Sequence, residues 1–407
     1  MNPFMIVWAM ARRHPGTTLL FIGVIAVAVS LGVGVTAQER AFRQGSAMAS
    51  DRFDLLIAAP GSPFETVLNT IFLRPSAVQL LDPEVTAKAL TDTRAEYAAP
   101  IGFGDNVRGL QVIGTISQFV DRLSGGVQDG RLFQHKDEAV LGASVPFQIG
   151  DVLEPNHGTT AFVGSTGEAI EQEGEHKHYE LTVVGRMKPT GNPWDRAIIV
   201  PIESIWAAHN LPDGHPEGSG AIGPPYDPAH TPGLPAIVMK GRTIADMYGL
   251  RGEYRSERSM AFFPAEVLLQ VYDLVGNVRQ VMSVMAVVTQ VLTFLAIFAG
   301  LFALMKLFER QFAVLRALGA SRSYVFSSVW LFACLIIITG VALGLGLGFS
   351  VAQVASNILA RATSISLSAA LGPDEMSLAF LGAALGIGLA TIPAALLYRR
   401  PVADLLR

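Results

Sequence analysis

The residues best spaced to hold a metal ion are two histidines, His176 and His178, in the polar part of the chain. Residues two apart in a strand share one face, so this pair could ligate a zinc or copper ion. Three more histidines follow, His209, His215 and His230, but the spacings match no defined metal site. Because acidic residues also surround the pair, hydrated loop histidines are the alternative, and we assign no metal to this chain.

Residues for nucleotide or hydrolytic chemistry form no recognisable motif. A phosphate-binding loop needs a lysine directly after a glycine, and none of the six lysines has a glycine before it. The sequence also contains no catalytic triad or metalloprotease signature. We therefore expect that this chain is not an enzyme and carries no cofactor of its own, so that energy for any work comes from another subunit.

The composition predicts an α-helical membrane protein. Of the 407 residues, 50% are hydrophobic and only 16% are charged, against about 25% charged residues in a soluble domain. The net charge of −4 gives no indication of nucleic-acid binding. Crossing a bilayer takes about 20 apolar residues. Four segments are long enough and contain no charged residue or histidine: 17–37, 281–305, 324–350 and 376–398.

Short basic flanks predict the orientation of these four transmembrane helices. Residues 1–16, 306–323 and 399–407 together hold nine basic and two acidic residues. Basic residues in short loops stay on the cytoplasmic side of a membrane. We therefore expect both termini and the 306–323 loop to be cytoplasmic, and residues 38–280 and 351–375 to lie outside, as in a multi-pass protein of the inner membrane.

The long polar segment 38–280 predicts a mixed α/β extracytoplasmic (periplasmic) domain between the first and second transmembrane helices. Its strand-like stretches are 53–60, 110–116, 179–187 and 196–205, and its helix-like stretches are 63–72, 83–92 and 200–208. The flanks 38–53 and 265–280 have helical patterns that would extend the adjacent spans as a stalk. Ordinary linkers next to the membrane are the alternative.

Glycines recur every four residues in two of the predicted spans. They are Gly340, Gly344 and Gly348 in the third span and Gly382 and Gly386 in the fourth. Small residues at this spacing let helix backbones approach closely. The stripes therefore predict close helix packing, either within one chain or between two chains of a dimer.

A compact basic patch, FERQFAVLRALGASRSYVF, separates the second and third spans at residues 308–326. Residues 306–318 have good helix propensity, and Gly319 can adopt the left-handed conformation that ends a helix. Ser321 can cap the start of the next helix. The pattern predicts a short cytoplasmic helix, a tight turn and then a span, although the requirement for positive charge on the cytoplasmic side explains much of the charge by itself.

This patch resembles the cytoplasmic loop of the FtsX-like permease family, the MacB-type subunits of ABC transporters. The shared core is the run Leu-Arg-Ala-Leu-Gly-Ala-Ser, residues 315–321, although Gln311 stands where the family commonly has glutamate. The order of one span, a large outer domain and three spans matches the family as well. So does the end of the chain, a basic pair followed by a proline and Leu-Arg at 399–407.

The resemblance implies that two copies of this chain form a homodimer in the membrane lipid and pair with a separate cytoplasmic ABC ATPase, which uses ATP and Mg. A coupling helix, about 306–320, would dock in a groove of that ATPase and pass its motion outward (mechanotransmission). Arginines would offer charge pairs and leucines apolar contacts. The implied ATPase-coupling residues are Glu309, Arg310, Phe312, Leu315, Arg316, Leu318 and Gly319.

Two roles follow from such a subunit. The first is a permease that drives efflux or extraction of a substrate in the periplasm. The alternative is a regulator that moves nothing across the membrane and activates an envelope hydrolase or another periplasmic partner protein. The residues do not distinguish these roles, and they identify neither a substrate nor a direction.

Overall fold

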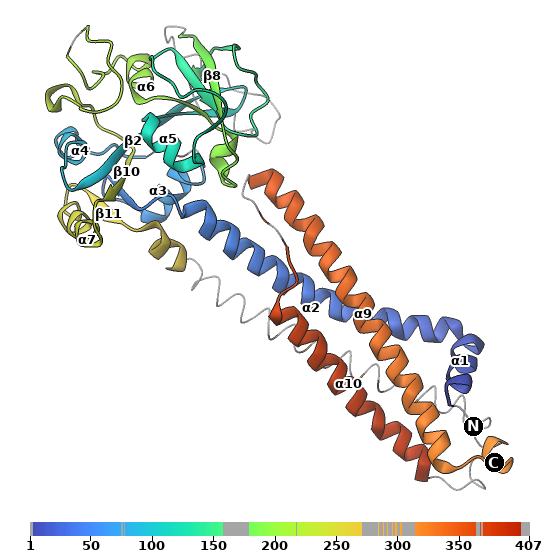
Figure 1. Ribbon diagram of the computed structural model, residues 1–407. Coiled ribbons are helices and arrows are strands. Elements are labelled where there is room, and N and C mark those ends of the chain that lie inside the picture. Colours follow the sequence, from blue (N-terminus) through green and yellow to red (C-terminus); the bar gives the residue numbers. More distant parts are fainter. Residues whose placement is uncertain are drawn as a thin grey trace, which may run out of the picture. The chain divides into compact units, whose positions relative to one another are not determined.

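The computed structural model describes residues 3–74, 76, 78–157, 179–216, 218–270, 314–363, 367 and 369–399, together with six single residues between 284 and 302. The chain divides into two compact units. The membrane unit comprises residues 1–43, 274–358 and 367–407, and the outer domain comprises residues 44–273 and 359–366. Figure 1 shows the helices of the first unit and the sheet of the second.

Four helices of the membrane unit have described bounds. They are α1 (Pro3–Arg13), α2 (Pro15–Ser50), α9 (Arg322–Thr363) and α10 (Pro373–Arg399). The last three are each long and apolar enough to cross a membrane. The predicted second span, 281–305, lies outside the described residues, except for six single residues that are all helical.

Helices α2 and α9 are longer than the spans predicted within them. Helix α2 continues past 37 to Ser50, in agreement with the helical extension predicted for 38–53, whereas α9 continues to Thr363 although the third span was expected to end near 350. At 1.5 Å per residue, the 42 residues of α9 extend about 63 Å, roughly twice the hydrocarbon thickness of a bilayer. Much of the predicted 351–375 loop is therefore helix, because the polar residues after 350 include no helix breaker before 364.

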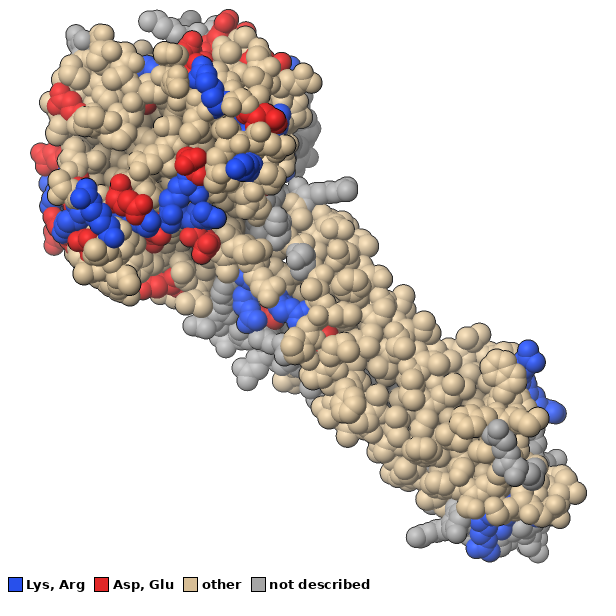
Figure 2. Space-filling model, viewed as in Figure 1, with Lys and Arg blue, Asp and Glu red and all other residues tan. Residues whose placement is uncertain are grey.

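The interior of the membrane unit is made mainly of aliphatic side chains from all four helices, with Met10 and Phe332 among them. Its most buried members include Val7, Val29, Val33, Ala333, Ile336, Ile337 and Ala394. Other large apolar side chains point outward, among them Leu19 and Leu31 of α2, Leu343 of α9 and Phe380 of α10. In Figure 2 the visible surface of this unit carries charge near its ends and almost none between them. Such a surface suits a lipid environment.

The outer domain is built on a mixed sheet of eleven strands in the order β11-β1-β10-β2-β3-β9-β5-β8-β4, with β6 on β8 and β7 on β2. The bounds are β1 (Leu55–Ala58), β2 (Ala95–Val107), β3 (Leu110–Thr115), β4 (Val127–Gly130), β5 (Glu138–Leu141), β6 (Val152–Leu153), β7 (Asn156–His157), β8 (Leu181–Met187), β9 (Ile198–Pro201), β10 (Ala236–Gly241) and β11 (Met260–Phe262). The β3–β9 and β5–β8 pairs are parallel, and the other pairs are antiparallel. Strands β1, β3, β8 and β9 fall within the four stretches predicted as strands.

Short helices pack around this sheet, and three of them begin at side-chain caps. The short helices are α3 (Pro63–Thr70), α4 (Pro83–Leu90), α5 (Ser117–Ser124), α6 (Ile202–Ala208) and α7 (Ile244–Glu253), with 3-10 turns η1 (Pro193–Arg196) and η2 (Pro228–His230). Ser62 and Asp82 each cap a helix whose first residue is proline, and Thr243 forms a capping box with Asp246. Three of these helices, α3, α4 and α6, lie within the stretches predicted as helices.

An aromatic cluster forms part of the core of the outer domain. The rings of Phe53, Phe119 and Trp194 have centroids 5.5 to 5.9 Å apart in tilted or edge-to-face pairs. Trp194 is fully buried, and its indole nitrogen donates to the carbonyl of Thr70 at 3.1 Å. Buried aromatic pairs of this geometry stabilise a core beyond the area they bury. The cluster therefore ties η1, α5 and the chain before β1 together.

A buried polar cluster lies beneath the Pro- and Gly-rich loop at 212–231. The Glu203 side chain on α6 accepts a hydrogen bond from the Gly223 backbone at 2.7 Å, and His215 Nε2 lies 3.5 Å from the same carboxylate oxygen. The Tyr226 ring packs against His215 and against Trp206 of α6. Burial raises the pKa of Glu203 above its usual range. The Glu203 carboxyl group thus anchors one side of this loop, and the Asp213 ion pair with Lys136 anchors its start.

We predict that Glu203→Gln stabilises the outer domain increasingly as pH rises from 5 to 8. A raised carboxyl pKa means that ionisation of Glu203 costs stability in the folded state, and this cost appears as pH rises above the usual carboxyl range. Glutamine keeps an acceptor for Gly223 without the charge. We expect Tm to increase by about 2–4 °C at the upper pH, as for a change of about 1 kcal/mol in a domain of this size.

Tryptophan fluorescence during thermal unfolding of the detergent-solubilised chain measures this difference, since Trp206 adjoins the cluster. Glu257→Gln, at an exposed position of the same domain, is the control. A Tm difference between Glu203→Gln and the unmodified chain that stays constant from pH 5 to 8 would contradict the prediction.

Candidate functional site

The described part of the predicted coupling segment is a helix end followed by a tight turn. Residues 314–317 are helical, and Gly319 has φ +97°, in the left-handed region. The Gly319 N–H donates to the carbonyl of Arg316 at 3.1 Å, and the Ala320 N–H donates to that of Leu315 at 3.0 Å. This pair of bonds is the Schellman motif. The structure therefore confirms that Gly319 ends the helix.

Helix α9 begins directly after this turn. The Ser321 hydroxyl accepts a hydrogen bond from the Tyr324 backbone at 3.3 Å, three residues into the new helix. Such a side-chain acceptor satisfies one of the unpaired N–H groups at a helix start. The turn and the long helix are therefore joined by only Ala320 and Ser321, and the predicted cap is confirmed.

Side chains of the coupling segment differ in how much surface they present. Leu318 is 80% exposed and Val314 is 51% exposed, whereas Leu315 is half-buried against the core of the membrane unit. Arg316 is also half-buried. The predicted positions Glu309, Arg310 and Phe312 lie outside the described residues. Among the described positions, Leu318 and Val314 therefore offer the apolar surface, and Leu315 points into the chain's own core.

The glycine stripe of α9 lies against α2. A Cβ atom placed on Gly340 would lie 2.7 Å from Ile25 Cβ, and one on Gly344 would lie 2.6 Å from Val29 Cβ. Real Cβ contacts are essentially never this close, so only glycine fits. Gly348 meets Val33 and the Ser30 backbone in the same way.

This stripe is thus filled by packing within one chain. In α10, Gly386 is buried and Gly382 is half-buried. Of the two roles predicted for glycine stripes, packing within the chain is the one that the α9 stripe fulfils.

A polar clamp joins α2 to the start of α10. The Arg40 guanidinium donates to Glu375 Oε2 at 2.7 Å and also to the carbonyl of Ala370. The Gly372 N–H donates to the same Glu375 oxygen at 2.8 Å, which closes the first turn of α10. The Glu375 side chain is 1% exposed and that of Arg40 is 13% exposed. We call the contacts of Arg40 with Glu375 and Ala370 the outer clamp.

A second polar contact lies beside the outer clamp. The Ser356 hydroxyl of α9 donates to Gln38 Oε1 of α2 at 3.1 Å. Buried alanines, Ala37, Ala352 and Ala369, pack together next to it. No ion pair between Arg40 and Glu375 was predicted from the sequence, because flanking charges indicate orientation and not pairing. The available signal was that Arg40 and Glu375, of opposite charge, lie just beyond the predicted ends of spans on the same side of the membrane.

His176 and His178, the histidine pair considered as metal ligands, lie outside the described residues. Within the described residues, no group of three or more His, Cys, Asp or Glu side chains is arranged to hold a metal ion. His209 and His230 instead contact a backbone carbonyl and the Asp227 carboxylate, respectively, each at 2.8 Å.

Comparison with known protein families identifies the C-terminal part of the chain. Residues 283–402 match the family described as FtsX-like permease C-terminal. The matched stretch includes the coupling turn, all of α9 and α10, and therefore one partner of the outer clamp. No curated protein matches the chain. This match confirms the resemblance to the FtsX-like permease family seen in residues 308–326, and it does not test the MacB-type subtype.

We predict that Gly344→Leu destabilises the membrane unit and that Gly346→Leu does not. Both changes improve helix propensity, but a side chain at 344 would collide with Val29, whereas a Cβ at 346 meets nothing within 4 Å. Overpacking of this kind costs about 1–3 kcal/mol. Thermal unfolding of the two purified variants in one detergent tests the difference, and equal stability of the pair would show that α2 and α9 do not pack as described.

The outer clamp gives a second prediction. Arg40→Met leaves the buried Glu375 carboxylate without its cation, and removing one partner of a buried pair costs about 3–5 kcal/mol. The double variant Arg40→Met/Glu375→Gln removes the charge as well and should recover most of that loss. Thermal unfolding of the single and double variants measures the recovery. A double variant no more stable than Arg40→Met would contradict the pairing.

Proposed function

From the premise that residues 283–402 are an FtsX-like permease domain, we propose that this membrane protein is the permease subunit of an ABC transporter, driven by a separate ATPase. The chain itself is not an enzyme. ATP and Mg bind to the partner subunit, and this chain converts ATP hydrolysis into mechanical work. Two permease chains act with the ATPase subunits in the inner membrane. Both termini are cytoplasmic, and the outer domain is periplasmic.

The observation that supports this proposal best is the continuity of α9 with the coupling turn. The helix starts at Arg322, three residues after Gly319, and runs unbroken to Thr363. Ser356, which contacts α2 beside the outer clamp, lies about 51 Å along the helix from Arg322. A hydrogen-bonded helix moves as a rod, so displacement of the turn by an ATPase moves the far contact as well.

The ATPase would bind where apolar surface is exposed at the turn. Leu318 and Val314 supply this surface, and Arg310, Glu309 and Phe312 would complete it with charge and an aromatic ring. Leu315 has a different role in this proposal. Because it packs into the membrane unit, it couples the docked helix to the spans.

The close approach of α2 and α9 disfavours movement of a substrate between these two helices. It favours action on a substrate or partner outside the membrane. Where glycines leave no room for a methyl group, a substrate has no path. Efflux or extraction of a substrate already in the periplasm is compatible with this packing. Activation of a periplasmic partner, such as an envelope hydrolase, without transport is equally compatible and is our second candidate.

The homodimer contact is expected on faces other than the α9 glycine stripe. That stripe already packs against α2 of the same chain. Exposed apolar side chains remain on α2 and α10, including Leu31 and Phe380, and these face lipid or a second permease chain.

We predict that Leu318→Asp reduces recovery of the ATPase with this chain by at least tenfold, as for loss of an interface hot spot. A charge at an apolar contact must lose its water when the ATPase binds, which weakens binding. An aspartate on a surface outside the contact keeps its water and has little effect on binding. The tagged chain is purified in mild detergent from its own cells. ATP hydrolysis and the amount of co-purified ABC ATPase are then measured.

Leu80→Asp, at an exposed leucine of the outer domain, is the matched control and should recover the ATPase normally. Unchanged recovery with Leu318→Asp, or no ABC ATPase with the unmodified chain, would refute the proposal. Reconstitution then separates the two candidates. Movement of a substrate supports the permease, and stimulation of a hydrolase without such movement supports the regulator.

A further inference from the structure

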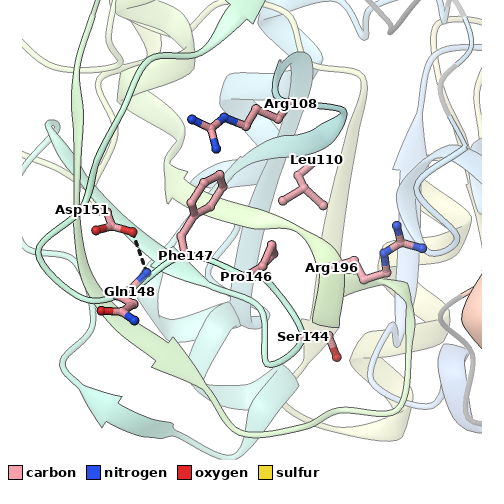
Figure 3. Close-up of a pocket in the computed structure, with 8 residues that line it drawn as sticks. All are labelled: Arg108, Leu110, Ser144, Pro146, Phe147, Gln148, Asp151 and Arg196. Carbon is pink, nitrogen blue, oxygen red and sulfur yellow. Dashed lines mark hydrogen bonds between the residues drawn. The ribbon is translucent and has the colours of Figure 1, made fainter.

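The outer domain contains an open pocket of about 700 Å³ next to the β2–β3 hairpin, within the size range of ligand sites. Leu110, Pro146 and Phe147 supply its apolar lining, and Arg108 and Asp151 supply charge. Figure 3 shows the Arg108 side chain extending above the Phe147 ring, with Asp151 farther along the same loop as Phe147. The guanidinium carbon lies 5.7 Å from the centre of that ring. A cation is thus held beside an apolar surface.

Arg108 stands where the backbone favours a different residue. Val107 and Leu110 pair across the hairpin, so Arg108 and Gly109 form a two-residue turn, and both have positive φ, +51° and +82°. Such turns favour Asn-Gly, because asparagine tolerates the left-handed conformation better than arginine. The local conformation therefore does not explain the arginine. What arginine provides at this position is a guanidinium group at the pocket.

The opposite wall of the pocket is fixed before any ligand arrives. The Arg186 guanidinium of β8 donates to the carbonyls of Val145, at 2.7 Å, and Phe147. The Gly150 N–H donates to Val183 of the same strand at 2.8 Å, and the Ser144 N–H donates to Asp195 at 2.7 Å. A wall held by this many bonds loses little conformational entropy when a ligand binds.

We propose that this pocket binds an organic monoanion with an apolar body. The Arg108 guanidinium pairs with the carboxylate or phosphate group, and Leu110, Pro146 and Phe147 cover the apolar part. Arg196, from η1, also lines the pocket, and Figure 3 shows its guanidinium directed away from Arg108. The Asp151 carboxylate, which accepts the Gln148 N–H at 2.7 Å, opposes a second negative group at its end of the pocket. These charges select one anionic group and disfavour a neutral ligand.

Binding of naphthoate, a flat aromatic carboxylate, tests the proposal on the full chain in nanodiscs of neutral lipid. Saturation-transfer NMR measures its affinity, and naphthamide serves as the uncharged analogue of the same shape. We expect naphthoate to bind at least tenfold more tightly than naphthamide, since a charge-assisted hydrogen bond is worth about one to two powers of ten in affinity.

Arg108→Asn is the decisive variant, because it removes the cation while giving the turn its favoured residue. We expect at least tenfold weaker naphthoate binding with an unchanged or higher Tm. Arg255→Gln, an exposed arginine elsewhere on the domain, should bind as the unmodified chain does. The proposal is overturned if the unmodified chain does not bind naphthoate, if naphthamide binds equally well, or if Arg108→Asn binds normally. None of these outcomes depends on whether an ATPase drives the chain.

Discussion

The close approach of α2 and α9 at three glycines determines how the membrane unit is built. In a bilayer, apolar side chains gain little free energy by exchanging contact with lipid for contact with another helix. Helices therefore associate through close packing and polar contacts. Gly340 and Gly344 let the α9 backbone reach the Cβ atoms of Ile25 and Val29. Because both helices continue well past this contact, it holds them together near the middle and leaves polar residues to hold their ends.

Those polar residues appear where the apolar segments end. Gln38 and Ser356 join α2 to α9, and Arg40 joins α2 to Glu375 of α10. Glu375 is almost completely buried, so the ion pair is costly to form and more costly to leave half-made. A clamp of this kind favours one arrangement of the helix ends over others. The clamp thus fixes the end of α2 against the start of α10.

The sequence predicts those features that depend on local chemistry. Gly319 and Ser321 end one helix and start another because their conformational and capping preferences act within a few residues. The outer clamp could not be derived in this way, since Arg40 and Glu375 are 335 residues apart and only folding brings them together. Strand β2, at 95–107, was missed because Pro100 and two glycines obscure its alternation, although pairing with β3 and β10 overrides those preferences. The length of α9 was underestimated because hydropathy marks the apolar segment and not the whole helix.

The two sides of the outer-domain pocket also differ in whether local sequence or distant contacts determine them. Arg186 fixes the loop wall through carbonyls that no sequence pattern would assign to it. Arg108, by contrast, is carried on a two-residue turn and held to that wall by its stacking on Phe147. A pocket with a rigid wall and a single side chain on a turn changes its affinity most easily by moving that side chain. In this proposal the β2–β3 turn sets the ligand affinity, while the sheet keeps its shape.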